Sequence, residues 1–222
     1  MPAANNTVAD TYSRLARQYD RAGNLCSCWG RASMTALTSL FLRQDYRVVA
    51  DVGCGTGTAL ARLASQRRSE ALLIGLDPAE NMRQRAIQHT RSHRNVRILD
   101  GRFEEMPLDS GSVDYLYSLF AFHWTSDMEV SVREISRVLT PRGEMDLFFI
   151  GRNNGREFIQ STTPIFLKYM GPARLLDSAR MRRQMSCPAA FELFSKVFGT
   201  QRLTVDESYQ TYYDTLAGHW GW

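Results

Sequence analysis

The chain has 222 residues, 44% of them hydrophobic and 23% charged, which suits one globular domain with a buried core and excludes a disordered chain. Its net charge of +4, without basic runs interleaved by aromatic residues, argues against a nucleic-acid-binding surface. Apolar runs such as residues 147–150 are far shorter than the roughly 20 residues that span a bilayer, and residues 1–10 lack a secretory signal, so we expect a cytoplasmic protein without a membrane span.

Two helices are predicted before the first strand, because apolar residues recur at helical spacing over residues 8–19 and again over residues 28–42. Short apolar runs then alternate with helical patterns. Strands are predicted over residues 47–52, 71–76, 96–99, 113–118 and 145–150, and helices over residues 59–65, 79–90 and 130–139. This alternation predicts an α/β fold, a doubly wound and mostly parallel sheet with helices on both faces. Ligands of such sheets bind beyond the carboxyl ends of the strands.

The last third of the chain has a different pattern. Helices are predicted over residues 158–170 and 188–198, with a basic helical or irregular stretch over residues 174–185 between them. A strand over residues 202–205 and a helix over residues 209–216 would follow. The four cysteines form no C-x-x-C pair and have no His-rich companion cluster, so no metal site is predicted.

The first predicted strand of the sheet ends in three glycines at every second position, Gly53, Gly55 and Gly57. Without a Cβ the backbone there can adopt positive φ and lie directly against a ligand, for which a nucleoside-like cofactor is suitable. Asp51 stands just before the glycines. Asp77 ends the next predicted strand, 22 positions after Gly55, which is close to the spacing of about 20 for an acid that accepts ribose hydroxyls. Asp77 could also cap the following helix.

The order Asp-x-Gly-x-Gly-x-Gly from Asp51, the later Asp77-Pro78 and the blocks at 101–108, 112–116 and 133–143 resemble the class I S-adenosylmethionine-dependent methyltransferases over about residues 10–150. The resemblance implies a Rossmann-like fold and S-adenosyl-L-methionine as cofactor. It implies that Asp51 faces the methionine ammonium through water and that Asp77 holds the ribose hydroxyls. The cofactor-binding residues that it implies are Tyr19, Asp51, Gly53, Cys54, Gly55, Gly57, Asp77, Pro78, Met82, Arg102, Phe103 and Ser118.

The sequence departs from this family at Arg102, where the family usually has an acid that accepts the adenine amino group. Arginine has no hydrogen-bond acceptor. Asp100 or Glu104 could take over that role, and the backbone amide of Phe103 could still meet the ring. Family sheets also usually close with a further strand, which no apolar run after Leu216 supplies, so either the last strand is missing or the sheet ends differently. That ending leaves open a non-catalytic, cofactor-binding relative or scaffold.

Within the family, residues 12–20 and 118–124 are most similar to the malonyl-acyl-carrier-protein O-methyltransferases of biotin synthesis. Quinone and natural-product methyltransferases share much of both segments, so a small-molecule acceptor is the alternative. The likeness implies that Tyr19 closes over the methionine end of the cofactor and that residues 118–124 line the transfer site. Tyr12, His123 and Trp124 would contact the acceptor there. A carboxylate acceptor is already ionised at neutral pH and needs no general base. A phenol or hydroxyl acceptor would need a general base, and His123 is then the catalytic candidate. The alternative is that His123 has only a structural role and packs in the protein interior.

The resemblance implies one methyltransferase domain over residues 1–222, with an N-terminal helical cap (1–44) and a cofactor-binding core (45–150). A helical insertion on the substrate side (151–200) and a C-terminal strand and helix (201–222) would follow. The insertion carries Arg174, Arg180, Arg182 and Arg183, which could face an acidic acyl-carrier protein or could form a solvated helix face. The sequence indicates no oligomeric state.

Overall fold

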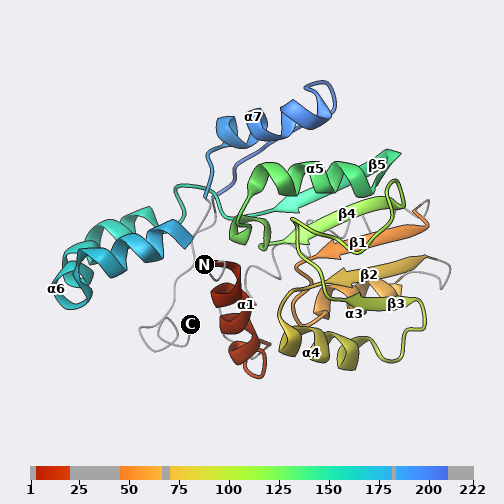
Figure 1. The fold of residues 1–222 in the computed structure, drawn as a ribbon, viewed down its shortest axis with the longest axis horizontal. Helices are drawn as coiled ribbons and strands as arrows, with labels where there is room; N and C mark the ends of the chain where they lie inside the picture. Colours follow the sequence, from red (N-terminus) through yellow and green to blue (C-terminus); the bar gives the residue numbers. More distant parts are fainter. Residues whose placement is uncertain (1–3, 21–45, 67–70, 182–183, 210–222) are drawn as a thin grey trace.

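The computed structural model describes residues 4–20, 46–66, 71–181 and 184–209. Its centre is a five-stranded parallel sheet in the order β3-β2-β1-β4-β5 (Figure 1). The strands are β1 (Val48–Val52), β2 (Leu72–Leu76), β3 (Val96–Leu99), β4 (Val113–Leu119) and β5 (Leu139–Phe148). The chain adds strands outward from β1 to β3 and then crosses back to pair β4 with β1. The strand order therefore reverses between β1 and β4, which is the place where such sheets bind ligands.

Helices cover both faces of the sheet (Figure 1). The α/β core contains α3 (Thr58–Gln66) and α4 (Glu80–Thr90) on one face and α5 (Met128–Val138) and α7 (Cys187–Phe198) on the other. Outside it lie α1 (Ala4–Leu15), the short 3-10 helix η1 (Phe122–Trp124) and α6 (Arg156–Met181). Because both faces are covered, β1 is buried from Val49 to Val52, which explains its continuous apolar run.

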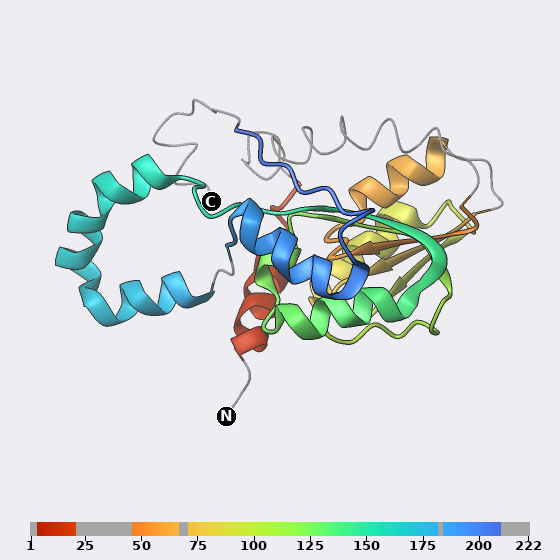
Figure 2. The same ribbon diagram turned by 90° about the horizontal axis from the view of Figure 1, so that it is seen from above.

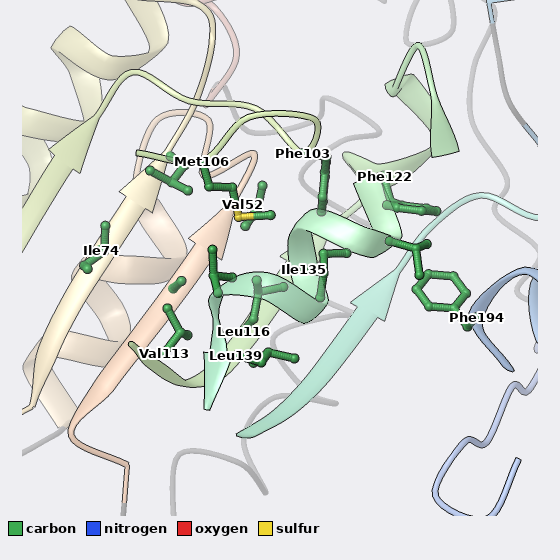
Figure 3. Packing of buried hydrophobic residues seen from close by; sticks show 14 residues of the cluster. Val52, Ile74, Phe103, Met106, Val113, Leu116, Phe122, Ile135, Leu139 and Phe194 are labelled. Atoms are coloured by element: carbon green, nitrogen blue, oxygen red, sulfur yellow. The ribbon is translucent and has the colours of Figure 1, made fainter. Parts of the chain in front are cut away.

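The side chains of the core alternate between the two faces. Val49 and Tyr117 join the cluster under α3 and α4, whereas Val52 and Leu116 join the cluster under α5 and α7. Figure 3 shows this second cluster, in which Ile135 of α5 lies over the strands. Its far end is aromatic, with the rings of Phe122 and Phe194 5.4 Å apart, so α7 is attached to the segment that follows β4.

The predicted α/β sheet is confirmed, and most predicted bounds agree with the structure within two residues. The strand predicted over 145–150 was placed too late, since β5 begins at Leu139, directly after α5. Residues 139–144 lack an apolar run because β5 is an edge strand with a bulge between its Leu139 and Glu144 pairings, and an edge tolerates Pro141. The strand predicted over 202–205 is wrong. Leu203 packs against the core by its side chain, and its backbone pairs with no strand.

The helical predictions over residues 158–170 and 174–185 correspond to α6, which consists of two helical segments that meet at Gly171 (φ 76°, ψ 163°). Pro172 follows directly and begins the second segment, where its missing N–H costs little. Figure 2 shows that α6 extends away from the sheet and turns back on itself at its far end. Within the described residues, no helix is long and apolar enough to cross a membrane. The helices predicted over 28–42 and 209–216, and the end of the chain, lie outside the residues described.

Candidate functional site

The three glycines after β1 all have positive φ, but their surroundings differ. A Cβ on Gly53 would collide with Ala121, and a Cβ on Gly57 would lie 2.8 Å from Ala86 of α4. A Cβ on Gly55 would meet no atom within 4 Å. Gly53 and Gly57 are therefore required for close packing of the turn, while Gly55 leaves its space to a pocket.

Asp77 holds this turn from the end of β2. Its Oδ2 accepts a hydrogen bond from the Gly55 amide at 2.9 Å, and its Oδ1 accepts one from the Ala79 amide at 2.8 Å, directly before α4. Asp77 thus lines the pocket and holds the turn before α4, but the N-cap residue of α4 is Ala79, so Asp77 does not have the predicted capping role. Burial raises the pKa of the Asp77 carboxyl, and the two amide hydrogen bonds oppose that rise.

Asp51 lies deeper, in the middle of the sheet, and its side chain is 1% exposed. Burial raises the pKa of its carboxyl from 3.8 to about 8, the Tyr117 hydroxyl beside it opposes the rise, and the charge of Asp77 adds to it. Asp51 Oδ1 has no hydrogen-bond partner among the described residues. A donor or a positive charge placed next to this oxygen would offset the cost of its burial.

A pocket opens at the carboxyl ends of the strands, next to Gly55 and Asp77. Eight of the twelve residues predicted to bind a cofactor line it: Tyr19, Gly53, Gly55, Asp77, Pro78, Met82, Arg102 and Phe103. Of the residues predicted to contact an acceptor, Tyr12 and Trp124 line it. The pocket therefore brings together side chains from α1, the glycine turn, the end of β2 and the segments after β3 and β4.

The other predicted site residues lie behind this lining. Asp51 and Cys54 are buried beneath the glycine turn, and Gly57 packs on α4. The Ser118 hydroxyl donates to the Val52 carbonyl at 2.6 Å, so it joins β4 to β1 and does not face the pocket. His123 is 1% exposed, with its ring centroid 4.9 Å from that of Trp124, and this packing keeps it off the pocket surface.

Sequence reasoning missed Val8 and Ala9 of α1, which belong to the pocket wall. Leu119, Phe120 and Ala121 also line the pocket, and they lie in the segment 118–124 that the resemblance placed at the transfer site. The reversal of strand order next to β4 points to the same place, because ligands bind there. Phe120 has φ 59°, the only positive φ of a non-glycine residue in the described part of the chain, and its amide donates to the Phe148 carbonyl at 2.7 Å.

The N-terminal segment is attached to the glycine turn and α4 by polar contacts. The side-chain amide of Asn81 donates to the Ser13 carbonyl at 3.0 Å. Asp20 accepts from the Thr56 hydroxyl at 2.6 Å and lies 3.7 Å from Arg85. These contacts hold α1 and Tyr19 as one wall of the pocket.

The segment after β3 supplies the opposite wall. Arg102 lines the pocket and lies 3.3 Å from Glu105, which is exposed. Of the two acids expected to replace the missing acceptor, Glu104 lines the pocket, whereas Asp100 does not line it and lies 3.2 Å from Arg83. Glu104 Oε1 also accepts from the Ser126 hydroxyl at 2.8 Å, so it connects this wall to the turn before α5.

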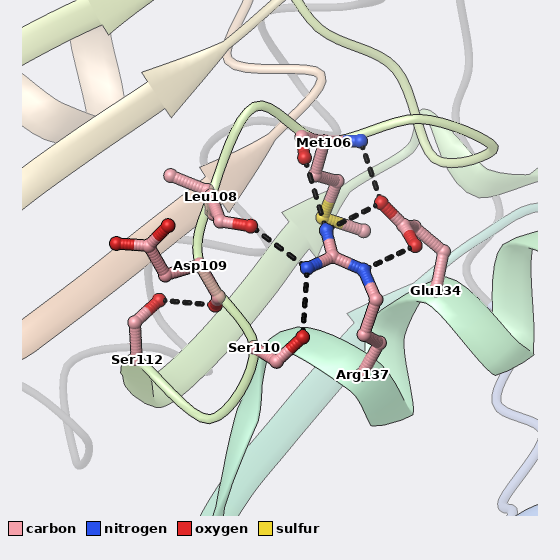
Figure 4. A network of polar contacts seen from close by, with 7 residues as sticks. All are labelled: Met106, Leu108, Asp109, Ser110, Ser112, Glu134 and Arg137. Carbon is pink, nitrogen blue, oxygen red and sulfur yellow. Dashed lines mark hydrogen bonds and ion pairs between the residues drawn. The ribbon is translucent and has the colours of Figure 1, made fainter.

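A partly exposed ion pair supports that wall (Figure 4). Arg137 of α5 donates to Glu134 at 2.7 Å and to the carbonyls of Leu108 and Met106 at 2.8 and 3.1 Å. Glu134 accepts from the Met106 amide at 2.8 Å, and its hydrogen bond with Arg137 lowers the pKa of its carboxyl. The two side chains therefore fix the loop that begins at Arg102.

Comparisons with known proteins agree with this geometry. Residues 50–146 match a family model described as a methyltransferase domain. The chain is 28% identical to a demethylmenaquinone methyltransferase of Staphylococcus aureus (strain MRSA252) over 169 residues, 74% of this chain and 65% of that protein. It is 29% identical to malonyl-[acyl-carrier protein] O-methyltransferase 1 of Coxiella burnetii over 156 residues, 70% of this chain and 51% of that protein.

A solved structure of an S-adenosylmethionine-dependent methyltransferase from Thermotoga maritima matches with a TM-score of 0.59 and 23% identity, over 84% of this chain and 78% of that chain. The described part of the chain thus has the α/β fold of that methyltransferase. The chain spans about half to two thirds of the length of the two curated relatives.

Proposed function

We propose that this chain, which carries a methyltransferase domain over residues 50–146, transfers a methyl group from S-adenosyl-L-methionine to an acceptor. The observation that carries the proposal is Asp77, a buried carboxylate that lines the pocket beside the open space at Gly55. Bound there, S-adenosyl-L-methionine supplies a methyl group on a positively charged sulfur.

The residues present suit that cofactor. Asp77 would accept the ribose hydroxyls, and the apolar side chains of Met82 and Phe103 would contact the adenine ring. Asp51, with its uncompensated Oδ1, would meet the methionine ammonium through water. Two buried carboxylates with raised pKa values favour a cationic ligand over an anionic one, because a nearby positive charge offsets their burial.

The protein's part in the reaction is alignment and exclusion of water, since transfer to a prepared acceptor needs the two reactants held in line. The wall of α1 and the residues after β4 cover the pocket from two sides. Tyr12 and Trp124, whose rings are 6.0 Å apart, contact each other across these two walls. We place the acceptor next to this aromatic pair.

The cofactor proposal is tested by calorimetric titration of the full chain with S-adenosylmethionine and with NAD. Asp77→Asn should weaken S-adenosylmethionine binding by at least tenfold, because each hydrogen bond to a charged group contributes about 1.5–3 kcal/mol. Asp100→Asn, at the end of β3 but off the pocket, is the matched control. Tight binding of NAD, or unchanged affinity in Asp77→Asn, would contradict the assignment.

For the acceptor we propose a carboxylate such as the malonyl group of an acyl-carrier protein, as in the biotin-synthesis relative. Arg102 is the cation among the described residues that line the pocket, and it would pair with the carboxylate. Such an acceptor needs no general base, which suits a buried His123.

A specific observation favours a second candidate, an aromatic small molecule such as a quinone. The wall near the aromatic pair is apolar, with Leu119 and Phe120 beside Tyr12 and Trp124. Turnover by Arg102→Gln separates the two acceptors, with exposed Arg97→Gln as control. Loss of transfer to malonyl carrier protein supports the carboxylate, and retained transfer to a quinone or phenol supports the second candidate. Cofactor binding without transfer to any acceptor in a cell extract would identify a non-catalytic relative.

A further inference from the structure

Most of the large apolar side chains that are exposed in the described part of the chain lie on the bent helix α6. Of the twelve exposed large hydrophobic residues in the described part of the chain, eight lie on α6: Phe158, Ile159, Ile165, Phe166, Leu167, Tyr169, Met170 and Leu176. Ile165 and Leu176 are 56% and 57% exposed, and Tyr169 is 76% exposed. A concentration of this kind on one element marks an interaction site.

The excess positive charge of the protein lies on α6 and on the residues directly before and after it. Residues 152–183 contain seven Lys and Arg and two Asp and Glu, a net charge of +5, while the whole chain has a net charge of +4. The rest of the chain is therefore close to neutral. A positively charged segment with exposed apolar and aromatic side chains suits an anionic phospholipid surface.

The exposed residues that precede the bend at Gly171 favour a lipid surface over a protein partner. Ile165, Phe166 and Leu167 are consecutive, and successive side chains of a helix point about 100° apart. The three side chains therefore point to directions spread over more than half of the helix circumference. A protein docked on one side of the helix would leave part of them exposed to water. A second copy of the chain would in addition bring two like-charged segments together. A lipid interface, in contrast, surrounds the inserted end of a helix.

The bend itself has the composition of an interfacial anchor. Tyr169 and Met170 precede Gly171, where α6 turns back, and Lys168 Nζ lies 5.4 Å from the centre of the Tyr169 ring. Tyrosine and lysine combine an apolar body with a polar end, which suits the boundary between headgroups and acyl chains. In Figures 1 and 2, α6 projects on the side of the sheet where the strands end, which is also the side of the pocket.

We propose that α6 docks the protein onto an anionic membrane surface. It would insert the side chains around Gly171 among the headgroups and hold the bilayer with Arg152, Arg156, Lys168 and Arg174. The proposal is independent of the proposed methyl transfer, because docking requires neither cofactor nor acceptor. It places the pocket on the membrane side of the molecule.

The test is co-sedimentation of the full chain, without cofactor, with vesicles of phosphatidylcholine and phosphatidylglycerol or of phosphatidylcholine alone. We expect binding to the anionic vesicles that weakens at high salt. Lys168→Glu with Arg174→Glu should raise the vesicle dissociation constant about 25-fold or more, at about fivefold for each cation lost. Ile165→Gln with Leu176→Gln should raise it about tenfold or more.

The matched controls are Ile87→Gln, at an isoleucine of α4 that is 48% exposed, and Arg62→Glu, at an exposed arginine of α3. Both should bind anionic vesicles like the parent chain. Equal binding to neutral and anionic vesicles would overturn the proposal, and so would α6 variants that bind like the controls. Two other results would overturn it as well. One is light scattering that shows a dimer of the parent chain and its loss in the α6 variants. The other is a parent chain that binds carrier protein through α6, with binding lost in the α6 variants, but binds no vesicles.

Discussion

Replacing the buried acid of β1 should make the protein more stable. The pKa of the Asp51 carboxyl is about 8 in the folded chain against 3.8 in a model carboxyl, so between these pH values the folded state holds a proton that the unfolded state has released. The free energy of unfolding then falls by about 1.4 kcal/mol for each pH unit in this window. From pH 5 to pH 8 this amounts to at most about 4 kcal/mol.

The variant Asp51→Asn removes this titration with little change of shape. Its stability advantage over the parent chain should be small near pH 4 and should grow as the pH rises to 8, as measured by urea unfolding at each pH. It should also bind S-adenosylmethionine more weakly, since the proposed ammonium contact loses its charge. Asp114→Asn is the control. Asp114 accepts from the Arg47 and Val48 amides at 2.9 Å each, so its loss should destabilise the chain. A stability difference for Asp51→Asn that does not change with pH would refute the reasoning.

Two further predictions concern the walls of the pocket. Arg137→Met should destabilise the chain by about 1–3 kcal/mol in urea unfolding, because it removes the hydrogen bonds that Arg137 donates to Glu134 and to two loop carbonyls. An unchanged midpoint would contradict the role given to this ion pair. Gly53→Ala should lower the thermal midpoint, since its Cβ would collide with Ala121 at positive φ, whereas Gly55→Ala should cost only about 1 kcal/mol of stability but weaken cofactor binding. Equal effects of the two substitutions on binding would show that Gly55 does not face the ligand.

The sequence by itself determined the elements of the sheet and the position of its ligand-binding edge. Both follow from local physical causes: buried parallel strands are continuously apolar, and the three glycines after β1 occupy positive φ, which other residues rarely adopt. The position of Asp77 at the end of β2, next to the glycine turn, also followed from the sequence. The edge strand β5 was placed late because an exposed edge has no such apolar signal.

Only the tertiary structure decided which of the predicted site residues face the pocket. Ser118 lies near the end of β4 and His123 follows β4, but neither faces the pocket. The Ser118 hydroxyl donates to the Val52 carbonyl of β1, and His123 is buried beside Trp124. Their direction depends on the register between β1 and β4 and on the turn at Phe120, which bring together residues 66 positions apart in the chain. A pattern of residue types carries no information on such pairings, because they arise from packing between distant segments.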